Sequence, residues 1–187
     1  IFRSTSAQTI SGTSATAFNH LTVDKASGTL TLSGSVSVSG NWTSTQGTID
    51  ATTNNSTVTF NGTSAQTIGG ASATTFNNLT ISNAAGVALT SSHNIQGTLT
   101  VSAGTFTTTG YTFTLVSNSS GTARIADLTG GGSITGNITM QRYIAGTEGW
   151  RMIGTPIISA TLNDFSDDIP TVFKYFWSES SQSFQNA

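Results

Sequence analysis

The sequence predicts an all-β protein whose main part is a right-handed parallel β-helix, or β-solenoid, with coils of about 19 to 21 residues. Three observations predict this fold. Short runs of strict polar and apolar alternation recur along the chain, one segment repeats, and charged residues make up only 7% of the 187 residues. Hydrophobic residues make up 35% and the formal net charge is −2, so the chain is expected to bury an apolar core.

The alternating runs predict strands with Leu, Val, Ile or Phe inward and Thr or Asn outward. They are TLTL at 29–32, TVTF at 57–60, NLTI at 78–81, TLTV at 98–101, TFTL at 112–115 and NITM at 137–140. The clusters of Gly, Ser, Asn and Ala between these runs predict turns. Phe60, Ile81 and Val101 occupy comparable inward positions 21 and 20 residues apart, which is the expected length of a coil.

The repeat pairs residues 2–28 with residues 60–86, a shift of 58, with 17 identities in 27 positions. A unit of this length divides into three coils of about 19 residues, in which each coil buries its face against the next. We therefore expect Phe18 and Phe76 to be buried three coils apart on the same side of the core. Trp42 aligns with Leu99 and is expected in the core as well.

An antiparallel sandwich, or a string of two small sandwich modules, would show the same alternation. The scarcity of charge and of two-residue hairpin signals favours the solenoid. The composition changes near residue 124, because only four formal charges precede it. We expect a solenoid over residues 1–140, of some seven coils, and a cap or the start of a small, truncated β-rich domain over residues 141–187.

Three elements of the sequence carry a resemblance to a known family. They are the run AQTISG at 7–12 with FNNLTI at 76–81, the run GTLTVSAGTFTTTG at 97–110, and GNITMQRYI at 136–144 followed by GWRMIGTPI at 149–157. Together they resemble the repeat-bearing β-solenoid secreted and cell-surface proteins of Bacteroidetes exported by the type IX secretion system. The resemblance covers nearly the whole chain. It implies an extracellular or cell-surface location and an architectural role, and its motifs contain no catalytic residue.

Composition argues against several function classes. The six Lys and Arg residues form no basic patch for nucleic acid, no apolar run approaches the length of a membrane span, and the absence of Cys removes thiolate metal sites. Asp24 and Asp50 are the only acids before residue 124. Asp24 is followed by Lys25, and we expect a solvated pair in a turn. The chain is therefore expected to be no enzyme and to need no cofactor.

The two histidines do not have the spacing of a metal motif. His20 aligns with Asn78 in the repeat, so we expect it in an exposed polar ladder. A candidate calcium site, set against the simpler interpretation of a solvated turn, is formed by Asn163, Asp164, Asp167 and Asp168.

Aromatic side chains and threonine rows offer two further candidates. Trp150 and Trp177 are candidates for stacking on sugar rings, against the alternative of a core role. The outward threonines are candidates for ice binding. Along the expected face they run as His20/Thr22, Asn41/Thr43, Thr57/Thr59, Asn78/Thr80, Thr98/Thr100 and Asn137/Thr139, and the candidate residues are Thr57, Thr59, Thr80, Thr98 and Thr100. Four of the six first members are Asn or His, which interrupts the expected row.

The sequence therefore predicts a non-enzymatic structural or adhesive surface protein, a rigid rod for display, attachment or filament assembly. An ice-binding protein and a carbohydrate-binding module remain as alternatives. Expected partners are other copies of the chain, further domains of a longer parent chain, or surface glycans. We expect the C-terminal segment to cover the last coil, and the first coil to pair with upstream sequence or head to tail with another subunit, because an open coil end leaves backbone groups unpaired.

Overall fold

The computed structural model describes residues 1–143, 175–178 and 183–186. The chain forms two compact units, Ile1–Ala145 and Gly146–Ala187. All regular elements among the described residues are strands. No helix in that part of the chain is long and apolar enough to cross a membrane.

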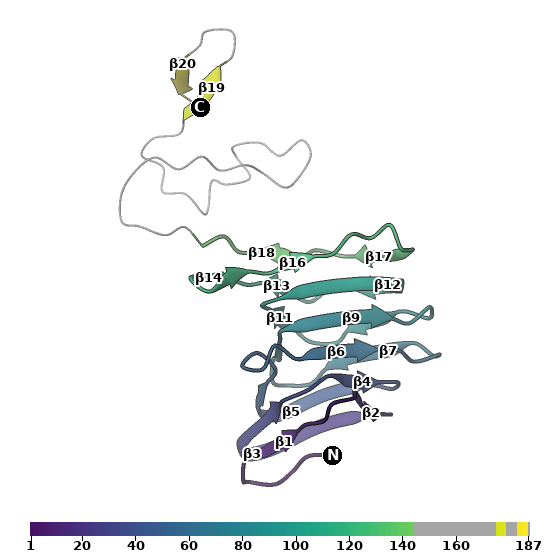
Figure 1. The fold of residues 1–187 in the computed structure, drawn as a ribbon. Helices are drawn as coiled ribbons and strands as arrows, with labels where there is room; N and C mark the ends of the chain where they lie inside the picture. Colours follow the sequence, from purple (N-terminus) through teal and green to yellow (C-terminus); the bar gives the residue numbers. More distant parts are fainter. Residues whose placement is uncertain (144–174, 179–182, 187) are drawn as a thin grey trace. The chain divides into compact units, whose positions relative to one another are not determined.

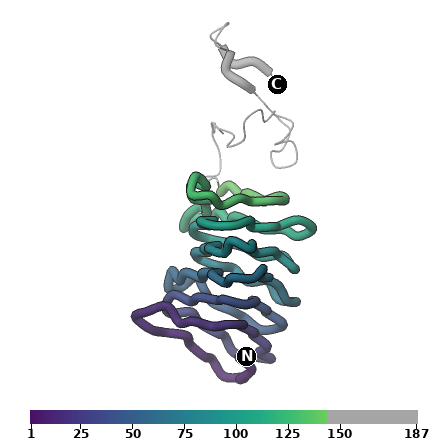
Figure 2. The backbone as a smooth tube through the Cα atoms, turned by 90° about the vertical axis from the view of Figure 1, so that its right-hand side faces the viewer, coloured from purple at the N-terminus to yellow at the C-terminus, as the bar shows by residue number. Residues whose placement is uncertain are grey.

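The larger unit is a β-solenoid of about six turns with a spacing of about 21 residues, which confirms the predicted all-β, parallel coil architecture. Its strands stack in parallel from coil to coil, so that the coils lie one above another (Figures 1 and 2). Each coil contributes strands to three faces, here called face 1, face 2 and face 3 in the order in which the chain visits them.

The faces are defined by their hydrogen-bonded strands. Face 1 holds the first part of β3 (Leu21–Leu32), the first part of β5 (Trp42–Asp50), β7 (Gln66–Gly69), β10 (Val87–Leu89), the second part of β12 (Thr98–Thr107) and β17 (Gly132–Thr135). Face 2 holds two hydrogen-bonded groups of strands: β1 (Gln8–Ile10) with the later parts of β3 and β5, and β8 (Thr75–Phe76) with β11 (His93–Ile95), β13 (Phe113–Leu115) and β18 (Thr139–Met140). Face 3 holds β2 (Thr16–Phe18), β4 (Val36–Val38), β6 (Thr57–Phe60), β9 (Asn78–Ser82), the first part of β12 and β16 (Arg124–Ile125).

Two short antiparallel pairs complete the described strands. β14 (Ser117–Asn118) pairs with β15 (Gly121–Thr122) within the solenoid, and β19 (Tyr175–Ser178) pairs with β20 (Ser183–Asn186) within the second unit. The β14–β15 hairpin lengthens one coil, and the loop between β5 and β6 lengthens another. The solenoid has about six turns, close to the predicted seven, because face 3 holds six strand segments and face 2 holds seven.

The core is a continuous apolar column inside the coils. Trp42 and Phe76 are both 0% exposed, with ring centroids 5.3 Å apart, so both predictions of burial are confirmed. Phe18 is only half-buried. It lies in the first coil, where its ring packs edge-on against Phe2. The predicted full burial of Phe18 is therefore wrong.

The repeat is not three whole coils, which corrects the predicted stacking of Phe18 on the same side as Phe76. Phe18 lies in β2 on face 3, whereas Phe76 lies in β8 on face 2. Likewise the repeated pair Phe2 and Val23 is bridged on face 1, and its counterpart Phe60 and Ile81 pairs on face 3. The 58-residue shift therefore covers two coils and two of the three faces, and equivalent residues appear on successive faces of the solenoid.

Candidate functional site

At two corners of the solenoid a polar side chain accepts a hydrogen bond from a backbone N–H of the next coil, an arrangement here called the polar clamp. His20 Nδ1 accepts a hydrogen bond from the backbone N–H of Asn41 in the next coil, 2.9 Å away, and Asn78 Oδ1 accepts one from Thr98 N–H at 3.0 Å. A Cβ atom at Gly40 would lie 2.6 Å from His20 Nδ1, so glycine lets the side chain pass over the corner. The prediction that exposed His20 replaces Asn78 in a polar ladder is confirmed.

The prediction that Asp24 and Lys25 form a solvated pair in a turn is wrong, because Lys25 is buried. Its side chain is 0% exposed, and its Nζ donates to the carbonyl oxygens of Ser4 and Ser6 and, at 3.0 Å, to Gln8 Oε1. Lysine is rarely buried without such partners. The reason is that residues 24 and 25 lie within the continuous strand β3, whose side chains alternate between the two sides, so that Lys25 points inward against the first coil.

In the second repeat an uncharged amide, that of Asn83, takes the place of the Lys25 ammonium group as the buried donor. Asn83 stands where Lys25 does, is 0% exposed, and its Nδ2 donates at 2.8 Å to both Ser64 O and Gln66 Oε1. Gln66 Oε1 also accepts from Gly62 N–H, and its Nε2 donates to Val38 O one coil earlier. Sequence analysis missed both contacts. The identity of Gln8 and Gln66 within the repeat was the available signal.

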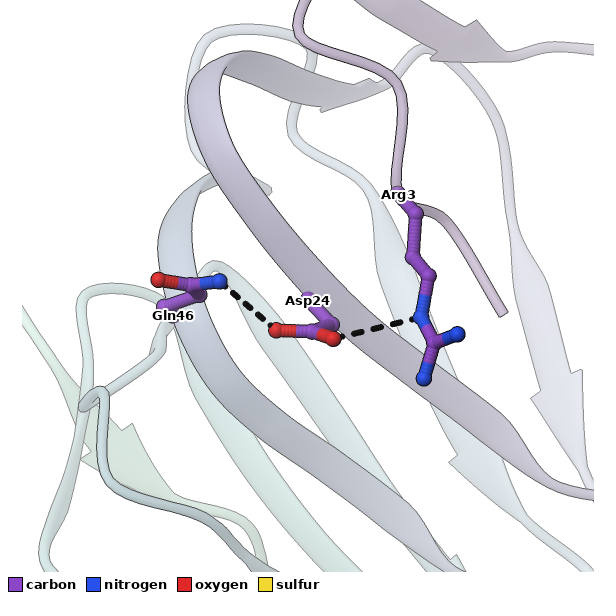
Figure 3. Close-up of polar contacts among 3 residues, drawn as sticks. All are labelled: Arg3, Asp24 and Gln46. Atoms are coloured by element: carbon purple, nitrogen blue, oxygen red, sulfur yellow. Dashed lines mark hydrogen bonds and ion pairs between the residues drawn. The ribbon is translucent and has the colours of Figure 1, made fainter.

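Asp24 and Asp50 each bind nearby side-chain or backbone groups. Asp24 contacts Arg3 at 3.2 Å and accepts a hydrogen bond from Gln46 at 2.8 Å, so the three side chains form a ladder across neighbouring coils (Figure 3). Asp50 accepts the backbone N–H groups of Thr52 and Thr53. These bonds, that from Thr53 first, hold the pKa of Asp50 below its usual value of 3.8. Within the described residues, no group of three or more His, Cys, Asp or Glu side chains could hold a metal ion.

His93 is the one histidine in the core, with 1% of its surface exposed. Its Nδ1 accepts the N–H of Thr74 at 3.0 Å, so its Nε2 carries the hydrogen and faces Ser91 Oγ at 3.0 Å. Burial lowers the pKa of His93 to about 4, and its contacts with the backbone of Thr74 and Ile68 oppose this shift only in part. His93 is thus a neutral structural acceptor whose ring packs at a tilt against Phe76, with centroids 6.0 Å apart.

The five candidate threonines for ice binding lie together on face 3. Thr59 pairs in register with Thr80, and Thr80 with Thr100. Thr57 pairs with Asn78, whose side chain accepts the N–H of Thr98. All five threonines are half-buried and alternate with buried core residues, so their side chains point outward.

The other members of the expected threonine row lie elsewhere. Thr22 and Thr43 pair with each other on face 1, and Thr139 pairs with Thr114 on face 2. The predicted row of six pairs is therefore wrong for the pairs that contain Thr22, Thr43 and Thr139, whereas the other three pairs share face 3. His20, Asn41 and Asn137 therefore do not interrupt the row on face 3. Among its six positions, 57, 59, 78, 80, 98 and 100, only Asn78 is not a threonine.

A shallow hollow of about 560 Å³ lies beside the polar clamp at the corner between faces 3 and 1. It is lined by Asn19, His20, Ser39, Gly40, Asn41, Asn61, Gly62, Thr63, Ser64 and Ala65. These residues offer amide, hydroxyl and imidazole groups to solvent, without an aromatic platform for a sugar ring.

The remaining candidates are not settled by this geometry. Asn163, Asp164, Asp167, Asp168 and Trp150 lie outside the described residues. Trp177 lies in β19, in register with Phe184 of β20. Comparison with protein-family models, curated proteins and solved structures found no match to the chain.

Proposed function

We propose that the chain is a non-enzymatic structural part of an extracellular or cell-surface protein, in which the solenoid is a rigid rod for display, attachment or filament assembly. The observation that carries this proposal is the continuous parallel pairing of strands from coil to coil. Each coil then touches only its neighbours, and the coils extend one axis at about 4.8 Å per coil, so six coils span about 30 Å.

Side-chain bonds between coils support the rigidity of this rod. The clamps at His20 and Asn78 fix one coil to the next at the corners, and the contacts of Lys25 and Gln66 do so inside the core. A buried polar group that loses its partner costs about 1 to 3 kcal/mol. Sliding one coil past the next would break several of these contacts together, so the stack resists shear as well as bending.

The rigidity can be measured with two spin labels, since the chain contains no cysteine. Thr22→Cys and Thr135→Cys place labels on face 1 about five coils apart, at about 24 Å before the label length is added. We expect a single narrow distance distribution in dilute buffer. A broad distribution would contradict the rigid rod.

The role at the cell surface requires a separate experiment. We expect antibodies against the solenoid to label intact, unpermeabilised cells that make the protein. Replacing residues 20–140 by a Gly/Ser linker of equal length should abolish the attachment or display of the parent protein while it still reaches the surface. Unchanged attachment with the flexible linker, or label found only in broken cells, would contradict the proposal.

A further inference from the structure

We propose that face 3 of the solenoid binds ice, through the hydroxyl and methyl groups of Thr57, Thr59, Thr80, Thr98 and Thr100. This binding function goes beyond the structural role proposed above and does not depend on it. The occupant is an uncharged crystalline lattice of water, so the site must be regular in two directions, outward facing and free of charge.

Regularity along the solenoid axis follows from the register. Ser37, Thr59, Thr80 and Thr100 form one continuous row across β4, β6, β9 and β12, whose middle members are paired residue by residue. The strands β6, β9 and β12 lie one above another in Figure 1. Neighbouring strands are about 4.8 Å apart, so the row spans about 14 Å.

Regularity along the strands follows from the alternation. Thr57, Asn78 and Thr98 precede the first row by two residues, at a distance of about 6.7 Å. Together the two rows form a grid of outward side chains over consecutive coils. On face 1 the corresponding row is broken because Gly69 follows Thr43, and on face 2 Asp50 follows Thr31. The later face 2 row of Thr75, Asn94, Thr114 and Thr139 includes the buried Thr114.

The hydroxyl groups of these threonines are available to a ligand. None of the five side-chain oxygens has a hydrogen-bond partner among the residues that the structure describes, whereas the hydroxyl of Thr105 on face 1 hydrogen-bonds that of Ser133. Threonine is branched at Cβ and its χ1 is restricted, so each hydroxyl and methyl pair is held in place before binding. A rigid grid loses little conformational entropy when it orders water.

The charge of face 3 fits an uncharged lattice. The outward positions of β4, β6, β9 and the first part of β12 are all Ser, Thr or Asn, and the first charged residue in these rows is Arg124, beside Thr98 on β16. An ionised side chain would orient water around itself and disturb the lattice. Each ordered water adds little free energy, so the binding must come from many contacts made at once.

The test measures ice growth with the purified full chain. Single ice crystals are grown in its solution, and the gap between melting and growth temperatures is recorded together with crystal shape. Thr80→Lys places a charged side chain at the centre of the grid. Thr43→Lys is the matched control, because Thr43 is also a half-buried, outward threonine on a central strand, but on face 1.

We expect faceted crystals and a measurable gap for the wild type and Thr43→Lys, and a gap at least about tenfold smaller for Thr80→Lys, with all three chains equally folded by circular dichroism. Rounded crystals without a gap in the wild type would overturn the proposal. So would equal loss of activity in the two variants, or a wild type that binds crystalline cellulose or chitin and leaves ice unaffected. If Thr80→Lys does not fold, Thr80→Val, which keeps the shape and removes the hydroxyl, takes its place.

Discussion

His93 should make the stability of the solenoid depend on pH. The side chain is almost fully buried and neutral, and its Nδ1 lone pair is used by the N–H of Thr74. Protonation would place a hydrogen on that nitrogen, facing the N–H that it now accepts. The folded chain therefore resists protonation, while the unfolded chain does not.

The size of the effect follows from the shift of the pKa from 6.5 to about 4. Above pH 6.5 the imidazole is neutral in both states and the stabilisation is fully present. As the pH falls, the unfolded chain takes up the proton first, so the folded state loses about 2 kcal/mol by pH 5 and about 3 kcal/mol by pH 4. Below pH 4 the folded state is protonated too, and the loss levels off.

Urea unfolding followed by tryptophan fluorescence at intervals from pH 7 to pH 4 measures this loss. His93→Asn is the control, because the chain already exchanges these residues at His20 and Asn78, where Nδ1 and Oδ1 accept equivalent N–H groups. We expect the variant to be less stable at pH 7, since it loses the packing against Phe76, but to show little change down to pH 4. A wild-type free energy of unfolding that stays constant between pH 6.5 and 4, or the same pH dependence in both chains, would refute this reasoning.

Four substitutions test other parts of the structure. Phe76→Ala should lower the free energy of unfolding by about 3 to 5 kcal/mol, and Phe18→Ala clearly less, because Phe18 is only half-buried. Equal losses in urea unfolding would contradict the assigned burial. Gln66→Ala should cost about 2 to 4 kcal/mol by the same assay, because it leaves a buried amide and backbone groups unpaired, and a cost below 1 kcal/mol would contradict the network. Arg3→Ala should cost less than about 1 kcal/mol and lose that effect at high salt, because Arg3 is largely exposed beside Asp24, whereas a larger, salt-independent loss would contradict a surface pair.

Much of the fold could be predicted because alternation and the repeat are local properties of the sequence. The period of two assigns Phe60, Ile81 and Val101 to the interior whatever the packing of coils, and all three are buried. The alignment of His20 with Asn78 predicted a shared polar role for the two residues, and the structure adds that each accepts a backbone N–H of the next coil. These inferences needed no knowledge of the coil length.

The inferences that failed needed the coil length. Corner loops such as the one between β5 and β6 change the number of residues in a coil without any change in the strand pattern, so division of the repeat into three equal coils placed Phe18 and Thr22 on the wrong faces. Lys25 failed for another reason. Its charge suggested a turn, but its long side chain finds three oxygen acceptors inside the corner, which only the arrangement of the first two coils reveals.

The register of face 3 underlies the rod, the rotated repeat and the proposed ice-binding grid, and a disulfide can test it directly in this cysteine-free chain. Thr59 and Thr80 are in-register neighbours on parallel strands, at a spacing of about 4.8 Å that lies within the range that a disulfide bridges. We predict that Thr59→Cys with Thr80→Cys forms an intramolecular disulfide under mild oxidation, seen as the loss of both free thiols in the monomer, while Thr22→Cys with Thr80→Cys does not. Two free thiols in the folded Thr59 and Thr80 variant would contradict the register.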